Sequence, residues 1–134
     1  MILKFSEAFN IAIHAMVYLV SRANETPVST AQVADSLGVS EAHLSKVFQR
    51  LARARLVKAV RGPHGGFRLA RGAASINLLE IHETIDGKVL NQAACLLEEN
   101  DCTRNKCVFG NLLSSVNAEV REYFKKTTLA DLAE

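Results

Sequence analysis

The sequence predicts a mainly α-helical fold with one small β-hairpin, on three observations. Apolar residues recur at three- and four-residue steps along most of the chain, the period of a helix with one buried face. Small polar residues that can cap a helix N-terminus precede several of these stretches. One segment, "LVKAVRGPHGGFRLA", instead has two strand-like runs around a glycine-rich turn. With 49% apolar and 22% charged residues, the 134-residue chain suits a globular protein whose core needs no disulfides.

The first helix is expected over residues 5–22, with Phe5 and Phe9 at the start of its apolar face. Asn10 and His14 interrupt the apolar run "AFNIAIHAMVYLV", and no small-residue cleavage pattern follows it. These features favour a core helix over a signal peptide or a membrane span. We therefore expect a cytoplasmic protein in a reducing setting.

Two short helices separated by a tight turn are expected next. Ser29 begins a capping box, which predicts a helix over about 30–37. Gly38 permits the turn, and Ser40 can cap a second helix over about 41–54. The apolar residues of this second helix fall on one face, so most of its polar and basic side chains lie off that face.

A hairpin is expected after the helix pair. Strand-like runs at 56–60 and 67–70 flank the turn "RGPHGG". Helix, tight turn, helix and hairpin, in this order, are the arrangement of a winged helix-turn-helix domain. In such a domain the second helix fits the DNA major groove, and the hairpin tip approaches the phosphates of a neighbouring groove.

The charge distribution also indicates a polyanionic partner. Residues 1–72 hold ten Lys/Arg against four Asp/Glu, whereas residues 73–134 hold six against ten. A packed helix pair with a solvated basic face is the competing interpretation, and the adjacent wing favours double-stranded DNA. The residues expected to contact DNA are His43, Ser45 and Lys46 early in the second helix, Arg50 further along it, and Arg61 and His64 in the wing.

The C-terminal part should hold a short helix, a polar segment and a long helix. Asn77 can cap the short helix, and Gly87 stops it. The long helix is expected from about Lys106 to Lys126, and "TTLADLAE" should form a short capped turn. Its apolar stripe consists of Val108, Leu112, Val116, Val120 and Phe124. We thus divide the chain into a DNA-binding domain (1–88), a cysteine-containing sensor loop (89–107) and a dimerisation helix with its C-terminal turn (108–134).

All three cysteines lie in residues 95–107, "CLLEENDCTRNKC". Cys95, Cys102 and Cys107 are spaced C-x6-C-x4-C, one thiolate short of the four ligands that an iron–sulfur cluster usually takes. Three alternatives stay open: zinc held with His82 or His14, a reversible thiol switch, and cysteines with no such role. An iron–sulfur cluster, of the 2Fe-2S or 4Fe-4S type, is the interpretation we favour.

With these pieces placed, nearly the whole chain resembles the Rrf2 family of bacterial winged-helix transcription regulators. The resemblance rests on "KFSEAFNIAIHAMVYL", "LSKVFQRLARARLVKAVRGPHGGFRLA", the three-cysteine loop and "TLADL". It implies a homodimer joined by the long C-terminal helix and bound to a palindromic operator. The family includes an iron–sulfur cluster assembly regulator, which would have a histidine where this chain has Gly110. It also includes a nitric-oxide-sensing repressor, whose acidic N-terminal ligand, supplied by the other subunit, would correspond to Glu7.

The expected function is therefore a homodimeric transcription regulator, a repressor, whose cluster senses redox, nitric oxide or iron–sulfur status. A cluster-free regulator that uses a thiol switch or a metabolite or partner signal is the alternative. A small iron–sulfur electron-transfer protein is a further alternative, and the basic wing argues against it. The sequence has no nucleophile–base constellation and no phosphate loop, so we do not expect an enzyme.

Overall fold

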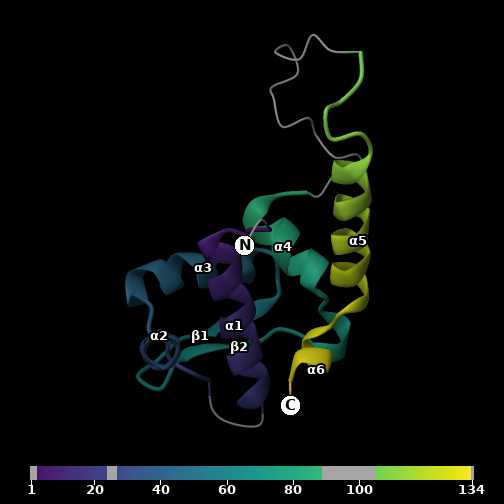
Figure 1. The fold of residues 1–134 in the computed structure, drawn as a ribbon. Coiled ribbons are helices and arrows are strands. Elements are labelled where there is room, and N and C mark those ends of the chain that lie inside the picture. The colour runs from purple at the N-terminus through teal and green to yellow at the C-terminus, as the bar shows by residue number, and fades with distance from the viewer. Residues whose placement is uncertain (1–2, 24–26, 89–104, 134) are drawn as a thin grey trace.

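The computed structural model describes residues 3–23, 27–88 and 105–133, and it is mainly helical with one two-stranded antiparallel hairpin, as predicted (Figure 1). In chain order the elements are α1 (Glu7–Ser21), α2 (Thr30–Leu37), α3 (Glu41–Arg53), β1 (Val57–Val60), β2 (Gly66–Leu69), the 3-10 turn η1 (Ala73–Ser75), α4 (Leu78–Asp86), α5 (Leu112–Lys126) and α6 (Leu129–Leu132). Within the described ranges no helix has the length and apolar character needed to cross a membrane.

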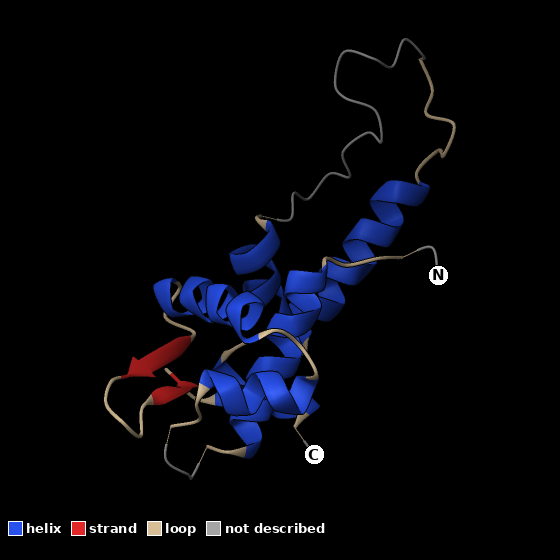
Figure 2. Cartoon of the chain, turned by 90° about the vertical axis from the view of Figure 1, so that its left-hand side faces the viewer, coloured by secondary structure: helices blue, strands red, loops and turns tan. Residues whose placement is uncertain are grey.

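Helix α1 forms the centre of the core. It contacts α2, α3, α4, α6 and β2, and the hairpin lies at the opposite edge of the molecule from α5 (Figure 2). Its fully buried residues are Phe9, Ala12, Ala15, Met16 and Leu19. The small side chains among them let neighbouring helices approach closely, which brings the N-terminal and C-terminal parts of the chain onto one core.

The predicted helix caps are confirmed. Gln32 N donates to Ser29 Oγ at 3.2 Å, and Ser29 N donates to the Gln32 side chain at 3.1 Å. Ser40 accepts from the backbone of α3, and Asn77 from that of α4. The first helix begins two residues later than expected, because Ser6 caps it and accepts from Phe9 N at 3.0 Å. Local hydrogen bonds thus define these helix starts.

The hairpin is tied to the rest of the domain on its β2 side. Val28 and Phe67 exchange backbone hydrogen bonds, with N–O distances of 2.8 and 3.0 Å. The Phe67 ring stacks on Phe48 of α3 with centroids 4.4 Å apart. A Cβ on Gly66 would lie 2.1 Å from Val28 O, so only glycine fits this crossing. The wing therefore has a fixed position relative to α3.

The last long helix begins later than the sequence suggested. Residues 107–111 form turns, with Gly110 N donating to Cys107 O and Leu112 N donating to Phe109 O, and Gly110 has a φ of +56°. A helix continuing through this point would need the right-handed conformation at Gly110. The expectation of a helix from about Lys106 is therefore wrong, and α5 starts at Leu112.

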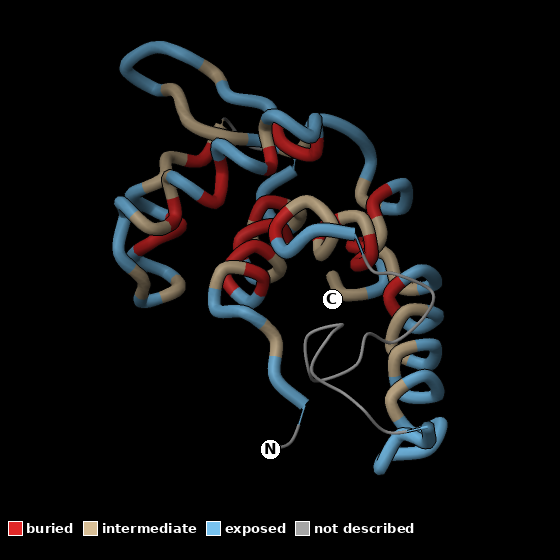
Figure 3. The backbone as a smooth tube through the Cα atoms, turned by 90° about the horizontal axis from the view of Figure 1, so that it is seen from above, coloured by how far each residue is buried: buried red, intermediate tan, exposed pale blue. Residues whose placement is uncertain are grey.

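The apolar stripe of α5 is divided between two environments. Phe124 is 7% exposed and packs against the rings of Phe5 and Phe9, with centroids 5.4 and 5.5 Å away. Leu112 and Val116, nearer the start of the helix, remain 56% and 39% exposed. Figure 3 shows the same change along α5, which is buried only toward its C-terminal end. Phe124 thus anchors the C-terminal end of the helix on its own chain, whereas Leu112 and Val116 belong to an apolar face that this chain leaves uncovered.

Candidate nucleic-acid interface and sensor site

Helix α3 presents one polar face because its other face is fully used by the core. Leu44, Val47, Phe48 and Leu51 are buried along one side of the helix. Gly38, at φ +67° and ψ 32°, ends α2 in the left-handed conformation and lets the chain turn into α3. The geometry is that of a helix-turn-helix with an exposed second helix.

The residues expected to contact DNA bases lie on the first two turns of α3. Lys46 is exposed, and His43 and Ser45 are half-buried. Gln49 is exposed one turn beyond Lys46, and we did not single it out from the sequence. Its helical spacing from Ser45 and Lys46 is the signal that could have found it, and a Gln amide is suited to reading adenine.

Arg50 has a partner inside the protein. Its guanidinium donates to the backbone carbonyl of Ile85, in the last turn of α4. The last carbonyls of a helix have no partner within the helix, so Arg50 satisfies one of them and adds a cation at the negative end of the helix dipole. In this structure Arg50 therefore links α3 to α4, and its expected contact with DNA stays a prediction.

The wing extends two of the candidate residues into solvent. Arg61 and His64 are exposed in the turn between β1 and β2, and among the described residues neither side chain makes an ion pair. Both are free to approach an anionic backbone.

The proposed cluster ligands are only partly described. Cys95 and Cys102 lie outside the described residues. Cys107 is an exposed free thiol in the turn that precedes α5. Across residues 3–23, 27–88 and 105–133, no three His, Cys, Asp or Glu side chains come together as a metal-binding group.

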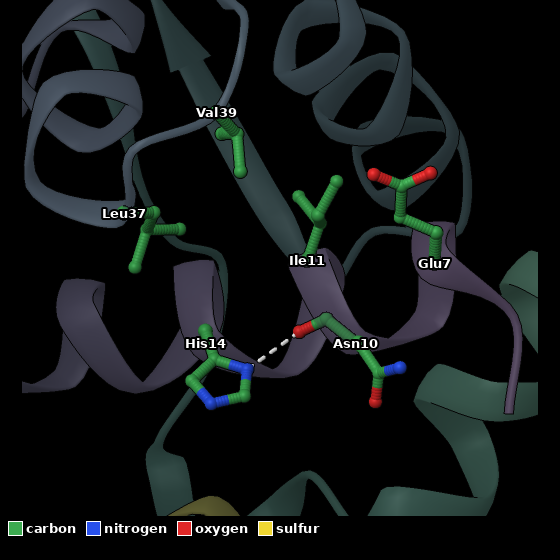
Figure 4. Close-up of a pocket in the computed structure, with 6 residues that line it drawn as sticks. All are labelled: Glu7, Asn10, Ile11, His14, Leu37 and Val39. Atoms are coloured by element: carbon green, nitrogen blue, oxygen red, sulfur yellow. Dashed lines mark hydrogen bonds between the residues drawn. The ribbon is translucent and has the colours of Figure 1, made fainter. Parts of the chain in front are cut away.

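Glu7 is the first residue of α1 and is exposed. Its carboxylate lies at one end of a hollow of about 290 Å3 that also borders Asn10 and His14 of α1 (Figure 4). Ile11, Leu37 and Val39 form the apolar part of the hollow. Among the described residues no side chain forms an ion pair with Glu7.

The two histidines considered as zinc ligands have roles within helices. His14 Nδ1 lies 2.7 Å from Asn10 O (Figure 4). The His82 ring packs edge-on to Phe9, with centroids 4.8 Å apart, and its Nε2 lies 3.6 Å from the Asp86 carboxylate. Neither joins a metal-binding group in the described part of the chain.

The last turn of α4 is connected to both α1 and α3. Ser6, the cap of α1, donates to the Asp86 carboxylate with Oγ 2.7 Å from Oδ1. Arg50 of α3 holds the carbonyl of the preceding residue, Ile85. Lys88 follows within two residues, and the chain then enters the cysteine segment. The three helices therefore meet nine residues before Cys95 in the chain.

The helix pair, the anchored hairpin and the basic exposed surface define a winged helix-turn-helix protein of the DNA-binding class. A family profile described as "Rrf2: Iron-dependent Transcriptional regulator" matches residues 5–134. The chain belongs to the Rrf2 family of HTH-type transcriptional regulators, as its sequence motifs suggested.

Individual relatives agree with this assignment. The chain is 31% identical over 121 residues to the HTH-type regulator ORF2 of Azotobacter vinelandii, covering 90% of this chain and 73% of that protein. It is 28% identical to the regulator IscR of Vibrio campbellii, covering 97% of this chain and 77% of the relative.

Two solved structures have the same fold. CymR, "the Global Cysteine Regulator of B. subtilis", superposes with a TM-score of 0.81 at 28% identity, over 98% of this chain and 97% of that one. IscR of T. potens superposes with a TM-score of 0.77 at 30% identity, over 98% and 87%.

Proposed function

We propose that this family member is a homodimeric repressor of palindromic operators whose DNA affinity is set by an iron–sulfur cluster. Cys95, Cys102 and Cys107 would hold the cluster with Glu7 of the partner subunit as the fourth ligand. The observation that carries the proposal is the three-cysteine segment placed directly between α4 and α5. The family's description as iron-dependent supports it.

The donor atoms suit such a group. Thiolates are the usual protein ligands of iron–sulfur clusters, and the Cys107 thiol is exposed. The Glu7 carboxylate is also exposed, so it can act as a ligand to a cluster held by the other subunit. When bound, the cluster supplies an iron centre that reacts with oxidants or nitric oxide.

Operator binding would divide between α3 and the wing. Lys46 and Gln49 are exposed on α3 and would read base edges from the major groove, with His43 and Ser45 beside them. Arg61 and His64 at the wing tip would hold phosphates. Helix α1 and the Phe48–Phe67 stack keep the two elements in one orientation.

The last turn of α4 is the route by which a change in the cysteine segment would reach α3. Arg50 holds the Ile85 carbonyl, and Ser6 holds Asp86. A shift of this turn therefore moves or releases Arg50 on α3. Since Glu7 follows Ser6 in the chain, the same turn is also connected to the proposed fourth ligand. The regulation requires that the two states differ in DNA affinity.

Dimerisation would use the uncovered face of α5. Leu112, Val116 and Tyr123 are 56%, 39% and 60% exposed and fall on one face at helical spacing. Such an apolar stripe on an anchored helix is suited to pairing with its own copy across a two-fold axis. This arrangement would place two copies of α3 for the two halves of a palindrome.

Operator selection tests the DNA-binding part of the proposal. Wild-type protein is used to select duplexes from a random pool, and affinity for the selected palindrome is then measured. Lys46→Ala and Arg61→Ala should weaken binding at least tenfold, and Lys125→Ala, at the far end of α5, should not. Selection of no common sequence would contradict the proposal.

Anaerobic purification tests the cluster. Visible absorption with matching iron and sulfide content is expected for the wild type, and Cys95→Ala, Cys102→Ala and Cys107→Ala should each remove it. Glu7→Gln keeps all three cysteines, so it should lower the iron and sulfide content without abolishing it. Unchanged iron and sulfide in the cysteine variants would contradict the proposed ligands.

A cluster-free thiol switch is the second candidate. The exposed Cys107 favours it, as does the likeness to CymR, the global cysteine regulator of B. subtilis. A reversible disulfide would then change the segment between α4 and α5. This candidate predicts protein without iron or sulfide whose operator affinity changes on mild oxidation and recovers with reductant.

A further inference from the structure

Two like charges face each other across the hairpin on its outer side. Lys58 of β1 and Arg68 of β2 are register partners, and both are exposed. Val57 and Phe67, which alternate with them, point to the core side, where Phe67 stacks on Phe48. Side chains directly opposite in an antiparallel pair lie about 4.5–5.5 Å apart at Cβ, and like charges there disfavour the pair.

No neighbouring carboxylate neutralises this pair. The sequence has no Asp or Glu between Glu41 and Glu80. Glu80 is already engaged by Arg71. Within the described residues, neither Lys58 nor Arg68 forms an ion pair. The hairpin therefore keeps an electrostatic repulsion on a solvent-facing surface, which an external anion would relieve.

The surface around the pair extends the positive charge toward the base of the wing. An open hollow of about 560 Å3 lies beside β1. Its walls include the small side chains of Ala52, Ala59 and Ala70, and its cations are Arg55, Lys58 and Arg71. Small residues beside several cations leave room for a bulky anionic chain to approach the backbone closely.

We propose that the outer side of the wing, defined by Lys58, Arg68 and Arg55, binds the phosphate backbone of DNA beyond the operator half-site. The proposal rests on the operator-binding function above. Along the hairpin, the Lys58–Arg68 pair is two residue positions further from the tip than the Val60–Gly66 pair that begins the turn. This separation is about 7 Å at the usual rise of a strand. When Arg61 at the tip contacts DNA, Lys58 and Arg68 are thus within a few phosphates of the same backbone.

Flank length separates this surface from the half-site contacts. Affinity is measured for two duplexes, the selected palindrome alone and the palindrome extended by about one helical turn on each side. The test variant is Lys58→Ala/Arg68→Ala, and Lys125→Ala/Lys126→Ala removes the same charge at the end of α5. The test variant should lose about tenfold or more on the extended duplex and less than twofold on the short one.

The salt dependence supplies a second measurement. Two phosphate contacts per protomer make four per dimer, so the slope of log affinity against log salt should fall by about 3–4 on the extended duplex. The thermal midpoint of the test variant should equal or exceed that of the wild type, because a repulsion has been removed.

Equal losses on both duplexes would overturn the inference, because the pair would then act inside the half-site. Wild-type affinity of the test variant on both duplexes would also overturn it, because the pair would then make no contact with DNA. Failure of the wild type itself to bind either duplex would contradict the proposed function.

Discussion

Replacement of Leu112 by aspartate tests the uncovered face of α5. Leu112 is the first residue of the helix and is 56% exposed. A carboxylate in the first turn is favoured by the helix dipole, so Leu112→Asp should leave the helix intact. In a two-fold dimer through this face, however, the change places a charge in the interface twice.

The magnitude follows from the exposed fraction. Full burial of a leucine side chain contributes about 1.5–3 kcal/mol, so covering the exposed part of Leu112 contributes roughly 1–1.5 kcal/mol per protomer. Two copies give about 2–3 kcal/mol, and desolvation of two carboxylates adds to the loss. At about 1.4 kcal/mol per factor of ten, the dimer dissociation constant should rise at least about a hundredfold.

Sedimentation velocity over a concentration series measures this constant. Ser114→Asp is the matched control, because it adds the same charge to the same turn at an exposed position off the apolar face. Equal dimer dissociation constants for Leu112→Asp and wild type would refute the assignment of this face to dimerisation. An equal rise in the dimer dissociation constant for Leu112→Asp and Ser114→Asp would instead indicate a general effect of the added charge.

Three further predictions concern the helices that hold the site. Arg50→Ala should lower the free energy of unfolding by about 1 kcal/mol in urea titrations, because the Ile85 carbonyl loses a charged donor; an Arg50 that only contacts DNA would change the salt dependence of binding and not stability. Phe124→Ala should lower the free energy of unfolding by about 3–5 kcal/mol, since Phe124 is the one buried residue of α5 among those described. Phe124→Leu should lower it clearly less, and equal losses for the two variants would argue against Phe124 as the aromatic anchor of α5. The backbone and hydroxyl of Thr128 lower the pKa of Asp131, so its contribution to stability is present above the unfolded-state pKa of about 4 and is lost as the pH falls through the folded-state pKa. The thermal midpoints of wild type and Asp131→Asn should therefore differ at neutral pH and converge in acid, and a constant difference would contradict this.

Local signals were predictable from the sequence because they act over a few residues. The capping box at Ser29 and the caps at Ser40 and Asn77 are bonds between residues three apart. The late start of α5 could not be predicted from its apolar period, because Val108 continues the stripe while Gly110 turns the backbone. Periodicity indicates which face a residue would occupy and not whether the helix has begun.

The parts of the site that depend on tertiary contacts were less accessible. The sequence predicts Arg50 only as a cation on the polar face of the second helix. Its partner in the structure is the backbone carbonyl of Ile85, 35 residues further along the chain. The opposition of Lys58 and Arg68 follows from the hairpin register. The predicted strand runs, 56–60 and 67–70, differ from β1 and β2 by one residue at three of their four ends, and a one-residue slip changes which side chains face each other.

The most direct test of the central claim is operator affinity measured with the same preparation before and after cluster removal. Anaerobically purified protein with iron and sulfide is titrated into labelled operator duplex, and the titration is repeated after chelation, with Cys107→Ala as a control that should not respond. We expect at least a tenfold difference in operator affinity between the two wild-type isotherms. Superimposable isotherms would contradict it.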